Sequence, residues 1–130
     1  MNKILIVIAC LLAVLLGCKA KAPIIECDLK NLMSSDTSFT NKSFTIKNTG
    51  NSDLIIEDFL TGCDCTTIGL KVGMHILPSD SLIVPVTITS SKKDNEKKKE
   101  ISITIKTNAL PRFTSFTFVH KNPSNLEQQL

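Results

Sequence analysis

Short stretches in which apolar and polar residues alternate are the main pattern of this chain. The alternation is clearest over residues 82–88, where the apolar set is Leu82, Val84, Val86 and Ile88. A period of two is typical of a β-strand with one buried face. Pro85 lies inside this run, and we expect it to place the strand at a sheet edge or a bulge, because proline cannot donate a ladder hydrogen bond.

Other segments complete the set of expected strands. Residues 25–29, 43–47 and 101–106 alternate in the same way, residues 54–59 are more continuously apolar, and Phe116 and Phe118 mark a last strand. Turn-forming residues separate these segments at 48–52, 78–81 and 109–112. About seven short strands without sustained helical periodicity predict an all-β fold, an immunoglobulin-like antiparallel β-sandwich over residues 24–121.

The beginning of the chain has a different pattern. Asn2-Lys3 is followed by an apolar run from Ile4 to Leu16, and then by Gly17-Cys18. This run is shorter than the ~20 apolar residues that a membrane-spanning helix needs, so residues 1–17 are predicted to be a cleaved signal peptide. Leu15-Leu16-Gly17-Cys18 is similar to a lipobox, which predicts a lipoprotein that begins at Cys18 and carries covalent lipid there, including palmitate-type chains.

A lipid on Cys18 would make the membrane a permanent partner, because each buried methylene contributes ~0.8 kcal/mol. Residues 18–23 then form a lipidated tether, and residues 122–130 a flexible C-terminal tail. Lys19 follows the cysteine, where an aspartate would resemble the usual inner-membrane retention signal. We therefore expect a lipid anchor in the outer membrane of a Gram-negative cell envelope, with the domain facing the periplasm.

Composition and charge narrow the classes of partner. The chain has 130 residues, enough for one domain, with six Phe and no Trp or Tyr. One local cluster of charge is Lys92–Glu100, which holds five lysines and three acids and no aromatic residue. This cluster is expected to be a solvated loop and argues against nucleic-acid binding. Contact of the lysines with anionic lipid headgroups is the alternative.

The cysteines carry the remaining candidate chemistry. Cys10 would leave with the signal peptide, so the exported domain keeps Cys27, Cys63 and Cys65, and the sequence allows a disulfide between any two of them. Residues two apart on an extended segment point to the same side, so Cys63 and Cys65 could also hold copper(I) or zinc, with Met74 and His75 completing the site. Burial as small apolar side chains is the structural alternative, and no cofactor beyond the Cys18 lipid is expected.

The order and spacing of several pieces resemble a known family. These pieces are Phe44–Gly50, Leu54–Ile56, Gly62–Thr66, Leu77-Pro78 and Ile103–Asn108. They resemble a bacterial family of unknown function, domain of unknown function 1573, whose members are immunoglobulin-like envelope proteins, often lipoproteins, with a Cys-Gly-Cys-Thr landmark. The family is similar in turn to the hydin and major sperm protein sandwiches.

The resemblance covers roughly residues 43–118 and implies the fold and the compartment, but no activity. Two positions depart from the family pattern. Asp64 replaces the glycine between the two cysteines, and Ser79 stands where a glycine commonly follows the proline. Aspartate tolerates a left-handed backbone better than most residues, so we expect these changes to affect local turns rather than the fold.

Two functions follow as expectations. The first is a membrane-anchored, non-catalytic interaction or structural module whose sheet edges or end loops bind another envelope protein. The second is a soft-metal or thiol-redox protein built on Cys63 and Cys65, with Met74, His75 and Cys27 as further candidates. The sequence contains no Gly-rich phosphate loop, nucleophile elbow or paired-carboxylate pattern. We therefore expect that the protein is not an enzyme.

Overall fold

The structure is a computed structural model that describes residues 20–33, 42–89 and 98–121, together with Lys3, Ile4, Ile6 and Ile8. The rest of the expected signal peptide, the lipidation site Cys18, the expected tail at 122–130 and residues 92–97 of the lysine-rich segment lie outside the described residues. Within the described part of the chain, no helix combines the length and the apolar character needed to span a membrane.

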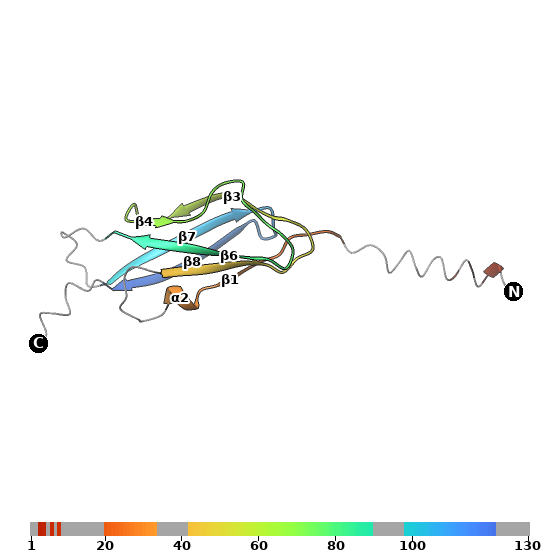
Figure 1. Cartoon of the computed structure of the whole chain (residues 1–130), viewed down its shortest axis with the longest axis horizontal. Coiled ribbons are helices and arrows are strands. Elements are labelled where there is room, and N and C mark those ends of the chain that lie inside the picture. The colour runs from red at the N-terminus through yellow and green to blue at the C-terminus, as the bar shows by residue number, and fades with distance from the viewer. Residues whose placement is uncertain are drawn as a thin grey trace, which may run out of the picture.

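In the described residues, eight strands form two antiparallel four-stranded sheets (Figure 1). One sheet has the order β1-β2-β6-β4 and the other the order β5-β3-β7-β8. The strand bounds are β1 Ile25–Asp28, β2 Lys42–Asn48, β3 Leu54–Thr61, β4 Thr66–Ile68, β5 His75–Ile76, β6 Ser81–Ile88, β7 Lys98–Thr107 and β8 Phe113–Lys121. The all-β sandwich predicted from the alternation is confirmed.

The alternating apolar residues meet between the two sheets and form one core. Val84 and Val86 of β6 are buried, as the pattern predicts, and so are Ile101, Ile103 and Ile105 of β7. Their partners in this core include Phe44, Ile46, Leu54, Ile56 and Phe118. Phe44 and Phe116 meet edge to face with ring centroids 5.0 Å apart, an arrangement favoured by the aromatic quadrupole. The core therefore explains the period of two in β2, β6, β7 and β8.

Pro85 does not lie at a sheet edge or a bulge, so that prediction was wrong. It lies in β6, which pairs with β2 on one side and β4 on the other. The Pro85 carbonyl accepts a hydrogen bond from the Gly69 N–H at 2.9 Å, just beyond the end of β4. The N–H and carbonyl groups of one strand residue point to the same neighbouring strand. Pro85 therefore lacks an N–H only on the side of Gly69 and β4, and no hydrogen bond to β2 is lost.

Three short elements were not predicted. β4 and β5 contain three and two residues, too few to show an alternation. The helix α2, Lys30–Met33, is a single turn whose first N–H, that of Lys30, donates to Asp28 Oδ1, and its Leu32 is fully buried. In addition, β7 begins at Lys98, inside the segment predicted to be a loop, because Lys98 to Glu100 pair with the end of β8.

The N-terminal segment is fixed to one end of the sandwich. The Ala22 N–H donates to Asn51 Oδ1 at 2.8 Å, and the Thr49 N–H donates to the Ile24 carbonyl at 2.9 Å. Gly50 lies so close to this segment that a Cβ there would be 2.5 Å from the Ile24 nitrogen. The chain therefore enters the domain beside the β2–β3 turn, at the end remote from β4 (Figure 1).

Candidate functional site

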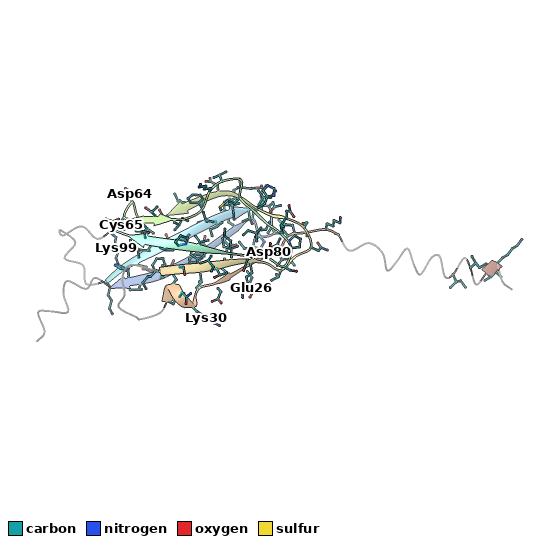
Figure 2. The ribbon with its side chains drawn as sticks, viewed as in Figure 1. Glu26, Lys30, Asp64, Cys65, Asp80 and Lys99 are labelled. Atoms are coloured by element: carbon teal, nitrogen blue, oxygen red, sulfur yellow. A yellow bond between two sulfur atoms is a disulfide. The ribbon has the colours of Figure 1, made fainter. Side chains whose placement is uncertain are left out.

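The segment between β3 and β4 contains the only disulfide in the described residues. It joins Cys63 to Cys65, with the two Cα atoms 5.1 Å apart. Both cysteines are half-buried, and Asp64 between them is exposed. Figure 2 shows Asp64 and Cys65 at the end of the sandwich opposite the N-terminal segment. The sulfur pair is therefore near the surface, at the tip of a turn.

Hydrogen bonds of the backbone and of threonine side chains hold this turn. The Thr66 N–H donates to the Cys63 carbonyl at 3.0 Å, and the Thr89 N–H donates to the Cys65 carbonyl at 2.8 Å. The Thr61 hydroxyl lies 3.3 Å from the carbonyl oxygens of both Cys63 and Thr66. None of these bonds uses a sulfur atom, so the shape of the turn does not depend on the disulfide alone.

The disulfide closes a loop of only three residues. In the chain-entropy account, such a loop restricts the unfolded state by about 1.6 kcal/mol, against roughly 3 kcal/mol for a loop of fifteen residues. The pair is therefore a weak structural crosslink.

The two sulfur atoms have different surroundings. The Cys65 N–H donates to Cys63 Sγ at 3.1 Å, whereas Cys65 Sγ has the Thr66 hydroxyl at 3.7 Å. A backbone N–H at this distance stabilises negative charge on sulfur more effectively than a longer hydroxyl contact. A thiolate would thus be better stabilised on Cys63 than on Cys65.

Cys27, the third cysteine of the domain, is a free thiol on β1. Its side chain packs against the core opposite Ile46. Burial, with a smaller contribution from the charge of Glu26, raises the pKa of the Cys27 thiol to about 11. Because the thiolate is the reactive form, Cys27 is an inert packing residue at neutral pH. The sequence left three disulfide pairings open, and the structure has the one between Cys63 and Cys65.

Met74 and His75 are not brought to the cysteine pair. His75 pairs with Ile55 near the start of β3, whereas Cys63 follows Thr61 at the end of that strand. Ile55 and Thr61 are six residues apart, which is roughly 20 Å at ~3.3 Å per residue. Met74 Sδ accepts a bond from the Lys71 N–H, and His75 Nδ1 lies 3.4 Å from Asp53 Oδ2. The four-ligand arrangement considered from the sequence is therefore not assembled.

No group of three or more His, Cys, Asp or Glu side chains with metal-binding geometry occurs among the residues that the structure describes. The chemistry that the cysteine turn can perform in this state is that of a disulfide, because two sulfurs bonded to each other do not act as thiolate ligands.

The threonines around the cysteines were missed as part of this site. Thr61 and Thr89 carried no signal in the sequence, since both lie in ordinary strand or loop composition. Thr66 is the last residue of the Cys-x-Cys-Thr segment, and its backbone N–H and hydroxyl both contact the turn. That segment is therefore a structural unit in which the threonine closes the turn.

The family with the description "Protein of unknown function (DUF1573)" matches residues 25–119. The chain belongs to the DUF1573 family. The match includes every strand from β1 to most of β8 and includes the cysteine turn. The resemblance seen in the order of the sequence pieces is confirmed.

A solved structure is also similar to this DUF1573 chain. It is the crystal structure of a protein of unknown function from Porphyromonas gingivalis W83, with a TM-score of 0.66 and 15% sequence identity. The similarity covers 82% of this chain and 50% of the other, so the chain spans about half the length of that protein. At this identity the likeness supports the fold alone. No curated protein matches the chain.

Proposed function

We propose that this DUF1573 chain is a lipid-anchored, non-catalytic interaction or structural module of the bacterial cell envelope. The observation that carries the proposal is the attachment of Ala22 and Ile24 to the β2–β3 turn. Three residues lie between Cys18 and Ala22. The four steps from Cys18 to Ala22 reach at most ~14 Å when fully extended, at ~3.5 Å per residue. A lipid on Cys18 would hold the β2–β3 end of the sandwich against the bilayer.

This attachment gives the domain a direction. With the lipid on Cys18, the β2–β3 turn would face the membrane, and the cysteine turn, which lies at the opposite end of the sandwich (Figure 2), would face away from it. In this orientation the strand edges along the side of the sandwich stay accessible to another protein. With Lys19 after the anchor cysteine, the outer membrane and the periplasm are the location that we propose.

The β8 edge is the surface that we propose for the partner. Within the described ranges β8 pairs only with β7. The Thr107 N–H donates to the Arg112 carbonyl, which makes 107 and 112 a hydrogen-bonded pair of this hairpin. Hydrogen-bonded pairs alternate along antiparallel strands, so Ser115 and Thr117 direct their N–H and carbonyl groups to the open edge. An extended segment of another envelope protein can add a strand there.

The anchor is tested by fatty-acid labelling. Cells that express the full chain are fed an alkyne fatty acid, and the wild type is compared with Cys18→Ala and with the matched control Cys10→Ala. We expect label on the wild type and on Cys10→Ala and none on Cys18→Ala. A chain that starts at Lys19 behind an ordinary secretion signal should be soluble. Label that persists in Cys18→Ala contradicts the anchor.

The edge is tested with a photo-crosslinking residue at position 115. Thr117→Pro removes one outward N–H without removing a bond to β7, whereas Thr117→Ala keeps the N–H. We expect a discrete crosslinked product that persists in Thr117→Ala and is lost in Thr117→Pro, while both variants melt at a similar temperature. A product unaffected by Thr117→Pro, or no product, argues against β8 as the docking edge.

A further inference from the structure

The cysteine turn has the features of a group that reacts rather than one that only crosslinks. Its two cysteines are separated by a single residue, and both sulfurs belong to half-buried side chains near the surface. A disulfide this short in sequence restrains the unfolded chain little, and accessible bonds of this kind are the ones that exchange with thiols. The pair is therefore placed where an incoming thiol can reach it.

The turn also has a framework that can persist when the sulfur bond opens. The Cys63 carbonyl is held by the Thr66 N–H, the Cys65 carbonyl by the Thr89 N–H, and the Gly62 N–H donates to the Ser102 carbonyl at 2.8 Å. These bonds tie the turn to β4, to the end of β6 and to β7. Opening the disulfide breaks none of them, so the two thiols would stay close enough to form the bond again.

The unequal surroundings of the sulfurs give the reaction a direction. When a disulfide is attacked, the sulfur that leaves must accept the electron pair, and a stabilised thiolate leaves faster. Cys63 Sγ already accepts a hydrogen bond from the Cys65 N–H at 3.1 Å. Cys63 is thus the better leaving group, and Cys65 Sγ is the sulfur that an incoming thiolate attacks.

We propose that the Cys63–Cys65 disulfide is a thiol–disulfide exchange centre that takes the dithiol of another protein as its substrate. The partner's thiolate bonds to Cys65 Sγ while the sulfur–sulfur bond breaks and its electron pair moves to Cys63 Sγ. The partner's second thiol, as a thiolate, then attacks the partner sulfur of the mixed disulfide and releases Cys65 as a thiolate.

The two protons lost by the partner's thiols return to Cys63 and Cys65 through solvent. The partner is oxidised to a disulfide, and the turn is reduced to two thiols. A disulfide-bearing partner reverses the sequence and restores the bond. Cys27 takes no part, because its side chain on β1 packs against the core. The exchange adds a redox reaction to the otherwise non-catalytic role proposed above, and it does not depend on the lipid anchor.

The first test is a redox titration of the full chain in detergent with mixtures of reduced and oxidised glutathione. Thiols are trapped with iodoacetamide, and peptides containing Cys63 and Cys65 are quantified by mass spectrometry. We expect reversible opening of the native disulfide, with a urea unfolding transition that stays cooperative in the reduced form. A disulfide that opens only in denaturant, or a reduced chain that has lost its transition, overturns the proposal.

The second test addresses direction. With limiting glutathione, we expect the transient mixed disulfide to form on Cys65 at least threefold more than on Cys63. In single-cysteine variants we expect Cys63 of Cys65→Ser to be alkylated several-fold faster at pH 7 than Cys65 of Cys63→Ser, since the N–H of residue 65 remains. Equal adducts in the wild type or equal rates in the variants contradict the assigned roles, and the wild-type adducts decide the matter if a variant does not fold.

Discussion

The side-chain amide of Asn48 donates a 2.9 Å hydrogen bond to the carbonyl oxygen of Ile76, and both residues are buried. The same amide nitrogen donates to the Ser52 carbonyl at 2.8 Å, and Asn48 Oδ1 accepts from the Gly50 N–H at 3.1 Å. One side chain therefore joins the end of β2, the β2–β3 turn and β5. This is the end of the sandwich at which the N-terminal segment enters.

Asn48→Ala is expected to destabilise the domain by about 2–4 kcal/mol, because the buried Ile76 carbonyl and the half-buried Ser52 carbonyl both lose their donor. The control is Asn51→Ala, which removes an exposed bond to the Ala22 N–H and should cost less than about 1 kcal/mol. Urea unfolding followed by circular dichroism measures both. Equal losses for the two variants would show that Asn48 is no more than an ordinary turn residue.

Ser79 has a positive φ of 67°, the conformation that favours glycine. In this left-handed conformation the Ser79 N–H donates to the Asn48 carbonyl at 2.9 Å, so the conformation is part of the turn. Ser79→Gly should stabilise the domain by about 0.5–1 kcal/mol, since a side chain in the left-handed region is strained. Ser81→Gly, in the extended strand β6, should instead destabilise it. Thermal unfolding distinguishes the two, and a loss of stability in Ser79→Gly contradicts the argument.

Gly69 and Pro85 should be energetically coupled. A Cβ on Gly69 would lie 2.5 Å from Pro85 Cγ and 2.7 Å from its Cδ, and the ring cannot move away without shifting β6. Gly69→Ala is therefore expected to cost about 1–3 kcal/mol as an overpacking change. In the double variant with Pro85→Ala, most of that cost should disappear. A double-mutant cycle by urea unfolding measures the coupling, and strict additivity would refute it.

The sequence was sufficient to predict the sandwich, because alternation in β2, β6 and β7 directly reflects one buried core. It could not place Pro85 inside a sheet, since that depends on β4 ending at Ile68 and on Gly69 having no side chain. It also could not choose among three disulfide pairings, because the choice depends on how far β1 lies from the end of β3. The separation of His75 from the cysteines likewise follows from β5 pairing with the start of β3, which no local pattern shows.

Cys27 should make stability depend on pH above neutrality. Its pKa is about 11 in the folded chain against an ordinary value of 9.0, so the unfolded chain loses the thiol proton first as pH rises. The stabilising contribution is full below pH 9 and is lost as pH rises toward 11. Between pH 9 and pH 11, we expect the urea midpoint of the wild type to fall relative to that of Cys27→Val. A difference that does not change with pH would show that the thiol is not desolvated.

His120 should make the stability of the domain depend on pH in the acid range. It is buried on β8, and burial, with a smaller contribution from the charge of Lys42, lowers its pKa below the ordinary 6.5. The folded chain then resists protonation more than the unfolded chain does, so stability is full above pH 6.5 and falls as pH drops through the lowered pKa. His120→Gln should weaken this dependence. An unchanged acid limb in the variant would assign the effect to other groups.

The most direct test of the central claim, a lipid-anchored module, is the intact mass of the protein extracted from membranes with detergent. We expect a chain that begins at Cys18, with the added mass of a diacylglyceryl group on its sulfur and its N-terminal peptide carrying all of that mass. A chain that begins at Met1, or one that begins near Cys18 without added lipid, would contradict it.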